Sequence, residues 1–431
     1  MKRCLALFWL LPLTGFSAPA LGSTAAHPAL PTPGESLAQI PLASLPAAPP
    51  PVGLPQLQQQ LSCPVLQQRL LAAVGAESRV WSITVADAAG RLLADVNGTV
   101  PRIPASNQKL ISTAYALDQL GPDYRLRSQL WRLGDGSFRL TGEGDPDLAL
   151  PQLQRFAKLA LGSGGSSGEP GTLVRLQLAE EPKQAWWPSG WEPGDRYTAY
   201  GAPITRLALT SNAIHEAVLN PPSRLQTLLQ RSLAQQGGKV QFSLVSARQP
   251  LPSDAVLLHE ESSASMHSLL SLANTESHNF TAEVLLRQAA GSWDLPIASQ
   301  RTMVWLNEQG LPMQGVRVAD GSGLDRANRL TSRLLTALLL RMDHHPYGRH
   351  YLASMAVAGE RGTLRNLYKG SPLQGQFRGK TGTISGVRAI SGVLLTADGP
   401  RYVSSISNGA YDPNSTIGAV LRQVQNTALC P

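Results

Sequence analysis

The sequence has little of what several common protein classes require. Only three of its 431 residues are cysteine, 6% are aromatic and seven are lysine. The formal net charge is +8, yet no basic run is interleaved with aromatic residues, which argues against a nucleic-acid partner. No group of histidine, cysteine or acidic residues has the spacing of metal ligands, so we expect no metal and no other cofactor.

Long hydrophobic runs are also scarce. Residues 4–16 are apolar, but this run is too short to span a bilayer and contains a proline. Two cations precede it and an Ala-Pro-Ala sequence follows it, which predicts a secretory signal peptide over residues 1–20. We therefore expect an exported, periplasmic protein with no transmembrane segment after cleavage. Residues 21–58 are rich in proline and alanine and are predicted to form a flexible linker.

Export would leave two cysteines, Cys63 and Cys430, at the two ends of the folded region. In an oxidising compartment such a pair is able to form a disulfide. The alternative is two unrelated buried thiols, and the disulfide is the interpretation we favour.

Patterns at the two ends of the chain predict one α/β domain. Residues 64–74 have the periodicity of a helix, and residues 79–99 alternate as a β-hairpin around an Ala-Gly turn. Residues 375–410 contain three further strand patterns, followed by a closing helix. The sequence therefore predicts an antiparallel sheet of five strands flanked by helices.

The middle of the chain has a different character, with short strand patterns and a loop rich in glycine and serine. Residues 137–258 are therefore predicted to be an inserted, mainly β domain. Long helical patterns return after it, so residues 59–136 and 259–431 are assigned to the two parts of one domain that the insert interrupts.

Ser106 and Lys109 are three residues apart at the predicted start of a helix, and so they share one face of it. A serine hydroxyl needs a nearby base to act as a nucleophile, and a lysine with a lowered pKa can be that base. Taken alone, the pair is more often a helix-start serine with a surface lysine.

Two further motifs follow. Ser277 and Asn279 lie between two helical patterns, and in an extended loop both side chains would point the same way. Lys380 and Thr381 precede Gly382 on a predicted strand near the C-terminus. A capping serine with a turn asparagine is the simpler explanation of the first of these motifs.

The three motifs in this order resemble those of the penicillin-recognising acyl-serine enzymes, with a β-lactamase/transpeptidase-like fold. The sequences "YTAYGAPITRLALTSNAI" and "VADGSGLDRANRLTSRLL" are similar to signatures of a narrower family, the D-alanyl-D-alanine carboxypeptidase/endopeptidases, or class C low-molecular-mass penicillin-binding proteins. This resemblance covers residues 62–428 and implies an inserted domain between the first two motifs. It also implies peptidoglycan peptides as substrates and β-lactam antibiotics as covalent inhibitors.

The resemblance implies a role for each motif residue. Ser106 would be the nucleophile and Lys109 its base, while Ser277 and Lys380 would pass a proton to the leaving amine. Asn279 would bind the peptide carbonyl.

The substrate's terminal carboxylate would be bound by Lys380, Thr381 and Thr383. Gly382 would let the substrate lie close to the sheet. His278, where the family usually has Asp or Asn, is expected to point away from the cleft.

Two other functions remain open from the sequence. A β-lactamase would use the same acyl chemistry with fast deacylation, so it would turn penicillin over. A non-catalytic wall-binding protein on the same fold would form no covalent penicillin adduct.

Overall fold

The computed structural model describes residues 54–163, 171–426 and 430. The predicted signal peptide and residues 21–53 of the predicted linker lie outside these residues. The last residues assigned to the linker do contact the folded domain. The backbone N–H of Gln58 donates a hydrogen bond to the carbonyl of Gly90, and Leu57 packs against the largest hydrophobic core. The linker therefore ends before residue 58, because the apolar side chain of Leu57 packs against the domain.

The larger sheet contains six strands in the order β2, β1, β11, β10, β9, β8, and all neighbouring strands are antiparallel. The strands are β1 (Trp81–Asp87), β2 (Leu92–Val96), β8 (Ala356–Val357), β9 (Phe377–Ile384), β10 (Val387–Thr396) and β11 (Gly399–Asn408). The predicted hairpin forms β1 and β2, and the three predicted C-terminal strands form β9, β10 and β11. The expected count of five was one too low, because two-residue β8 is too short to have an alternating pattern of its own.

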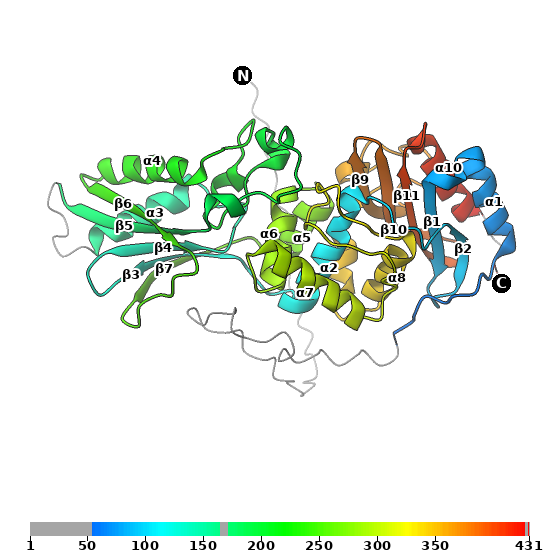
Figure 1. Cartoon of the computed structure of the whole chain (residues 1–431), viewed down its shortest axis with the longest axis horizontal. Helices are drawn as coiled ribbons and strands as arrows, with labels where there is room; N and C mark the ends of the chain where they lie inside the picture. Colours follow the sequence, from blue (N-terminus) through cyan, green and yellow to red (C-terminus); the bar gives the residue numbers. More distant parts are fainter. Residues whose placement is uncertain (1–53, 164–170, 427–429, 431) are drawn as a thin grey trace, which may run out of the picture.

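Helices cover both faces of this sheet (Figure 1). On one face, α1 (Pro64–Val74) packs beside α10 (Pro413–Asn426). α1 buries Leu66, Leu70 and Val74, which recur every four residues and so form one apolar stripe. On the other face, α8 (Ser332–Asp343) contacts β1, β10 and β11.

A helical layer lies beyond α8, between the two sheets of the molecule (Figure 1). Its central helix is α2 (Gln108–Leu120), in which every residue from Gln108 to Leu117 is buried. α2 contacts α5 (Met266–Asn274), α6 (Asn279–Ala289), α7 (Leu295–Glu308) and α9 (Gly348–Ala353). α2 therefore packs against helices on several sides.

The inserted region forms a second sheet of five strands, in the order β6, β5, β4, β3, β7. These are β3 (Arg127–Arg132), β4 (Phe138–Gly142), β5 (Leu173–Glu180), β6 (Lys239–Ser246) and β7 (Val256–Ser262). β4, β5 and β6 run parallel, while β3 is antiparallel to both of its neighbours.

The inserted region was predicted to be mainly β, but it contains helices as well as strands. It includes α3 (Leu150–Gly162) and α4 (Pro221–Ala234), which share a hydrophobic core with the second sheet. Parallel strands need long crossover connections, and these two helices lie in the connections between β4, β5 and β6. The sheet also begins at Arg127 and ends at Ser262, outside the predicted limits of 137 and 258.

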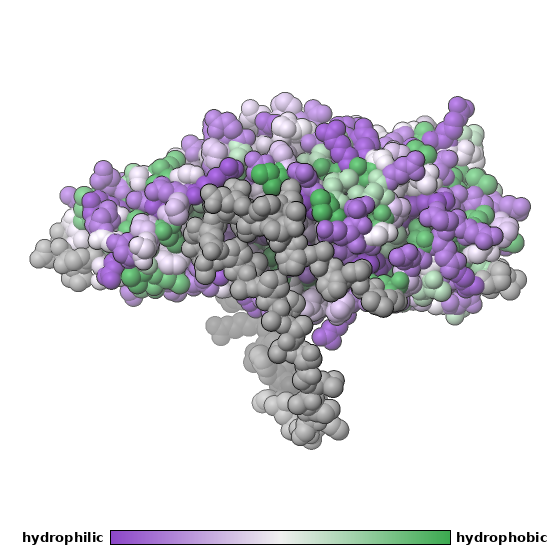
Figure 2. Space-filling view, turned by 60° about the horizontal axis from the view of Figure 1, so that its bottom comes forward, coloured by the Kyte–Doolittle hydropathy of each residue, from purple (hydrophilic) through white to green (hydrophobic). Residues whose placement is uncertain are grey.

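The two sheets lie at opposite ends of an elongated molecule (Figure 1). On the face seen in Figure 2, hydrophobic and hydrophilic residues are interspersed. None of the helices in the described ranges is long and apolar enough to cross a membrane. At the far end of the larger sheet, a disulfide joins Cys63, just before α1, to Cys430, with 5.1 Å between their Cα atoms.

Candidate active site

Ser106 occupies a short turn of 3-10 helix, Ala105–Asn107, that leads directly into α2. Ala105 has a φ of +47°, a conformation that is uncommon for residues other than glycine and costs free energy. The Nζ atom of Lys109, one turn along, lies 2.9 Å from the Ser106 Oγ atom. The helix start thus places a hydroxyl and an amine in direct contact.

Lys109 is fully buried and has two further hydrogen-bond acceptors. Its Nζ lies 2.6 Å from Asn279 Oδ1 and 2.7 Å from the Ser322 carbonyl oxygen. Burial lowers the pKa of Lys109 to about 7, while the charges of Asp320 and Glu283 act in the opposite direction. A substantial neutral fraction is therefore present at neutral pH, and a neutral amine can accept the hydroxyl proton of Ser106.

Ser277 and Asn279 come from the junction of α5 and α6 rather than from an extended loop. Ser277 has a φ of +63°, and Asn279 is the first residue of α6. This tight junction still brings both side chains to the cavity that Ser106 lines, where Asn279 contacts Lys109 and Ser277 contacts Lys380. Asn279 also donates a hydrogen bond from Nδ2 to the Tyr200 carbonyl oxygen, in the segment that follows β5.

Lys380 lies on β9 and is fully buried. Its Nζ donates to Ser277 Oγ at 2.9 Å and to the carbonyl oxygen of Thr381 at 2.8 Å. Burial holds the pKa of Lys380 well below its ordinary value, and the nearby charge of Lys109 lowers it further. Two amines of low basicity therefore lie close to the two serine hydroxyls.

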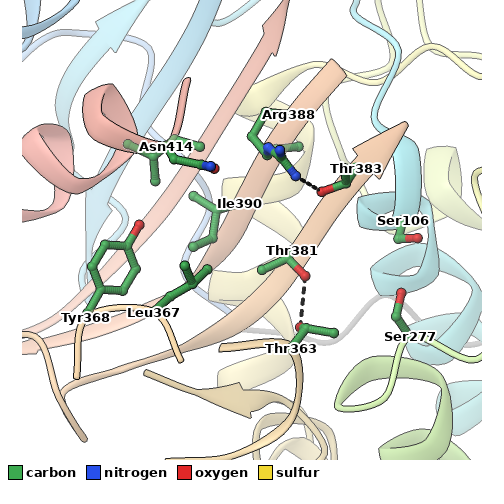
Figure 3. Close-up of a pocket in the computed structure, with 12 residues that line it drawn as sticks. Ser106, Ser277, Thr363, Leu367, Tyr368, Thr381, Thr383, Arg388, Ile390 and Asn414 are labelled. Carbon is green, nitrogen blue, oxygen red and sulfur yellow. Dashed lines mark hydrogen bonds between the residues drawn. The ribbon is translucent and has the colours of Figure 1, made fainter. Parts of the chain in front are cut away.

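Two cavities meet at these serines, and both are lined by Ser106, Ser277 and Thr383. The first, of about 270 Å³, extends over β9 and β10 toward α10 (Figure 3). The second, of about 730 Å³, extends toward the inserted region and includes Tyr200 and Asn279. Lys380 is not among the residues that line either cavity.

The edge of β9 faces the first serine. The carbonyl of Gln376 accepts from β10, whereas that of Phe377 accepts from Ala358 beside β8. Strand residues alternate in direction and the pairing of β9 with β10 has no irregularity, so the N–H of Thr383 also points away from β10. This open edge is where a backbone donor can meet a reacting carbonyl.

Gly382 lies where β9 comes close to the turn that bears Ser106. A Cβ atom at this position would lie 2.6 Å from the Pro104 carbonyl oxygen and 3.3 Å from the Ala105 Cβ. The glycine therefore allows β9 to pack against the turn that bears Ser106, within the protein itself.

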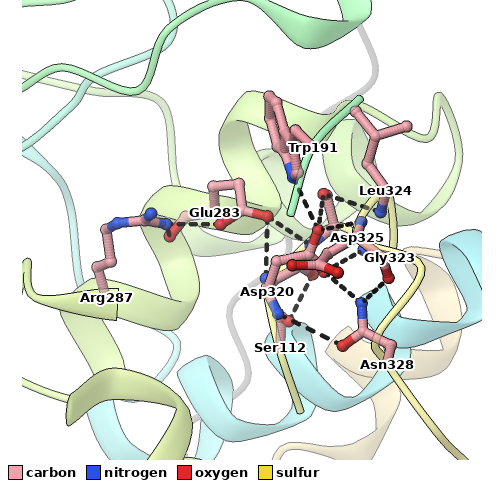
Figure 4. A network of polar contacts seen from close by, with 11 residues as sticks. Ser112, Trp191, Glu283, Arg287, Asp320, Gly323, Leu324, Asp325 and Asn328 are labelled. Atoms are coloured by element: carbon pink, nitrogen blue, oxygen red, sulfur yellow. Dashed lines mark hydrogen bonds and ion pairs between the residues drawn. The ribbon is translucent and has the colours of Figure 1, made fainter. Parts of the chain in front are cut away.

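A buried polar network supports the Lys109 side of the site (Figure 4). Glu283 Oε1 accepts the N–H groups of Gly321 and Ser322, and its Oε2 forms an ion pair with Arg287 at 2.6 Å. This network fixes the position of the Ser322 carbonyl oxygen that contacts Lys109.

Asp320 is the second carboxylate of this network. It accepts hydrogen bonds from the backbone of Gly323 and Asp325 and from the side chains of Asn328 and Trp191. Trp191 belongs to the segment after β5, so this bond connects the inserted region to the loop beside Lys109. Glu283 and Arg287 were not predicted as site residues from the sequence, where their i,i+4 spacing on α6 was the one local signal for the pair.

His278 is half-buried and does not line either cavity. Its Nδ1 lies 2.8 Å from Thr281 Oγ1. Burial, with the charge of Lys109 as the second cause, lowers the pKa of His278 to about 4, so its ring is neutral at neutral pH.

Comparison with known proteins identifies the class. The family model described as "D-Ala-D-Ala carboxypeptidase 3 (S13) family" matches residues 66–221 and 212–424, and the chain belongs to this family. The enzyme class predicted from the motifs, a D-Ala-D-Ala carboxypeptidase and thus a hydrolase, is thereby confirmed.

The particular relatives cover most of the chain. The carboxypeptidase DacB of Mycolicibacterium smegmatis is 28% identical over 88% of this chain and 90% of its own. A D-alanyl-D-alanine carboxypeptidase of an Actinomadura species is 26% identical over 78% of this chain and 79% of its own.

Among solved structures, penicillin-binding protein 4 of Haemophilus influenzae has a TM-score of 0.71 at 18% identity, covering 83% of this chain and 98% of that one. A second structure of the same protein, complexed with a β-lactam, has a TM-score of 0.63 at 19% identity, covering 80% of this chain and 95% of that one. The expected fold class, an α/β architecture with an antiparallel sheet flanked by helices, is confirmed.

Proposed function

We propose that this protein is exported and hydrolyses the terminal D-Ala-D-Ala bond of peptidoglycan stem peptides, and peptide cross-links, through an acyl-serine intermediate. The observation that carries this proposal is the 2.9 Å contact between Ser106 Oγ and the buried amine of Lys109. An amine with a pKa near 7 is well matched to removing a hydroxyl proton at neutral pH.

In the proposed acylation step, Lys109 removes the hydroxyl proton of Ser106, and Oγ attacks the carbonyl carbon of the penultimate D-alanine. The backbone N–H groups of Ser106 and Thr383 stabilise the oxyanion, since the first lies at a helix start and the second on the open edge of β9. No metal or cofactor takes part in this proposal.

The leaving amine then receives a proton. The contact of Lys380 Nζ with Ser277 Oγ offers a route, in which the serine hydroxyl protonates the amine and the lysine restores the hydroxyl. Asn279, which lines the larger cavity, donates the second N–H of Nδ2 to the substrate's amide carbonyl, since the first is bonded to the Tyr200 carbonyl. Water finally releases the acyl group from Ser106.

A β-lactam contains a strained amide that the same serine would attack, so we propose that penicillins acylate Ser106. The β-lactam complex of the Haemophilus influenzae protein supports this part of the proposal. In an assay with a fluorescent penicillin, we expect one label per molecule and no label in Ser106→Ala. A matched control is Ser223→Ala, an exposed serine on α4 of the inserted region that we expect to label normally.

The outcomes of this assay separate the alternatives. A stable adduct supports a carboxypeptidase, whereas rapid release of hydrolysed penicillin would indicate a β-lactamase. If neither the protein nor its variants form an adduct, a non-catalytic wall-binding role becomes the better explanation.

The natural substrate is tested separately. Purified peptidoglycan fragments would be digested and the products analysed by mass. Loss of one alanine from pentapeptides indicates carboxypeptidase activity, and conversion of cross-linked dimers to monomers indicates endopeptidase activity. The mass of the protein recovered from the periplasm tests export, because removal of residues 1–20 would place the new N-terminus at Leu21.

A further inference from the structure

A peptide ending in D-Ala-D-Ala presents a carboxylate close to the scissile bond, and the site needs a cation to recognise it. Lys380, the cation first expected to do so, is poorly placed. Its Nζ contacts Ser277 and the Thr381 carbonyl, its side chain is fully buried, and it lines neither cavity. Its geometry fits proton transfer rather than contact with the carboxylate.

Arg388 is the charged residue among those that line the smaller cavity. It lies on β10 directly opposite Thr383 of β9, in a pair without mutual backbone hydrogen bonds, where side chains on adjacent strands come closest. One Nη atom of Arg388 donates to Thr383 Oγ1, and Figure 3 shows Thr383 between Arg388 and Ser106.

The guanidinium of Arg388 has donor capacity to spare. Its Nε is buried and lacks a hydrogen-bond partner, and among the described residues no acidic side chain forms an ion pair with it. An unpaired cation of this kind, in a cavity that contains the nucleophile, calls for an anionic ligand.

We propose that Arg388, together with the hydroxyls of Thr381 and Thr383, binds the α-carboxylate of the substrate's terminal residue. Thr381 and Thr383 are two residues apart on β9, so their side chains project from the same face into the cavity. The planar guanidinium can offer two parallel N–H groups to a carboxylate, which also sets its orientation.

The surroundings of the cavity favour such a contact. Leu367, Ile390 and Ile417 line the same cavity. Apolar walls exclude water and so strengthen the attraction between a guanidinium and a carboxylate. The cavity would therefore select substrates with a free C-terminal carboxylate next to the scissile bond. This inference rests on the proposed function, because it names how that same site recognises its substrate.

The first test compares a peptide ending in D-Ala-D-Ala with the same peptide ending in a carboxamide. The measured quantity is the ratio of kcat/KM for the acid to kcat/KM for the amide. In Arg388→Gln we expect this ratio to fall roughly tenfold to hundredfold, the range for loss of a charge-assisted hydrogen bond. In Arg388→Lys the ratio should fall by less, because lysine keeps the positive charge but lacks the planar guanidinium with its two parallel N–H groups.

The control is Arg326→Gln, which removes a cation from the larger cavity. We expect it to keep the acid-to-amide ratio of the unaltered protein. An unchanged ratio in Arg388→Gln would overturn the inference, and so would an equal fall in both variants, because that would indicate a general effect of charge.

The second test is independent of turnover. The affinity of the acid and amide peptides is measured by calorimetry in Ser106→Ala and in the double variant Ser106→Ala with Arg388→Gln. We expect the acid to bind more tightly than the amide in the first protein, with the preference lost in the second. If the unaltered protein cleaves neither peptide, the proposed function fails, while this measurement still decides whether Arg388 recognises the carboxylate. Equal preferences in the two proteins would overturn that assignment.

Discussion

At the scale of single residues, the chemistry depends on amines that are buried among neutral acceptors. Lys109 contacts a hydroxyl, an amide oxygen and a backbone carbonyl, none of which carries a charge. The nearest carboxylates, Asp320 and Glu283, raise its pKa but do not outweigh the effect of burial. The lysine is thus able to lose its proton at a pH where an exposed lysine could not.

This electrostatic balance predicts the pH dependence of acylation. Because Lys109 must be neutral to act as a base, the rate constant of penicillin labelling should rise about tenfold per pH unit below pH 7 and level off above it. Labelling rates between pH 5 and pH 9 would measure this, with circular dichroism at each pH as a check on folding. Lys109→Arg should label poorly at every pH in this range, since its guanidinium stays protonated. A flat profile in the unaltered protein would remove Lys109 as the base.

Lys380 gives a second prediction at this scale. Lys380→Met keeps most of the side chain's volume but removes the amine that contacts Ser277. We expect acylation to slow roughly tenfold to hundredfold, from the loss of a contact of about 1.5–3 kcal/mol. The melting temperature should change little, because removing a buried amine also removes its desolvation cost.

The same variant separates proton transfer from carboxylate recognition. The slowing in Lys380→Met should be similar for the acid and the amide peptides, in contrast to Arg388→Gln. Acylation at the rate of the unaltered protein would contradict the proton-transfer role.

At the scale of elements, the site depends on how closely β9 approaches the turn before α2. Gly382→Ala would place a Cβ atom 2.6 Å from the Pro104 carbonyl oxygen. We expect strand and turn to separate, with a stability loss of about 1–3 kcal/mol and a disproportionate loss of acylation, because Thr383 and Ser106 lie on the two separated elements. Gly162→Ala, at the end of α3, is the control, because no atom of the described residues lies within 4 Å of the added Cβ. Normal acylation in Gly382→Ala would show that the close approach is not needed.

The elements differ in how well the sequence predicted them. α1 begins at Pro64 as predicted, because proline fits the first helical turn and the apolar residues behind it recur every four positions. β9, β10 and β11 were predicted from three successive strand patterns, and Gly386, with a φ of +72°, lies in the turn between the first two strands. The helices of the inserted region were not predicted, since α3 and α4 lie in sequence among short strand patterns and a stretch rich in glycine and serine.

Contacts between distant segments explain what the sequence did not predict. The order of the three motifs along the chain, and the family resemblance that it carries, identified Ser106 and Lys109. The burial of Lys380, which is absent from the lining of both cavities, depends instead on the packing of β9 against the turn Ala105–Asn107 and its neighbouring strands. The position of Arg388 in the cavity depends on the register of β9 and β10, which places it opposite Thr383.

At the scale of the whole molecule, the inserted region is coupled to the site through a long segment between β5 and α4. Trp191 of this segment is part of the largest hydrophobic core and bonds to Asp320. Tyr200 of the same segment accepts a hydrogen bond from Asn279 and lines the larger cavity. The insert therefore contributes one wall of the region where the substrate peptide would lie.

The two ends of the chain provide the last prediction. Cys63 and Cys430 are 367 positions apart and lie where α1 packs beside α10, so their disulfide closes nearly the whole chain. A simple chain-entropy model gives a stabilisation of roughly 6 kcal/mol for so long a loop, and measured values are usually about 2–4 kcal/mol.

Neither cysteine lines a cavity of the site. Replacing both cysteines by serine should therefore lower the melting temperature by several degrees yet leave penicillin labelling at 25 °C nearly unchanged. Reductant should lower the melting temperature of the unaltered protein by a similar amount, and it should not change the melting temperature of the double variant. Two alkylated thiols in the unreduced, denatured protein would exclude the bridge, and a loss of labelling at 25 °C would show that the chain ends influence the site.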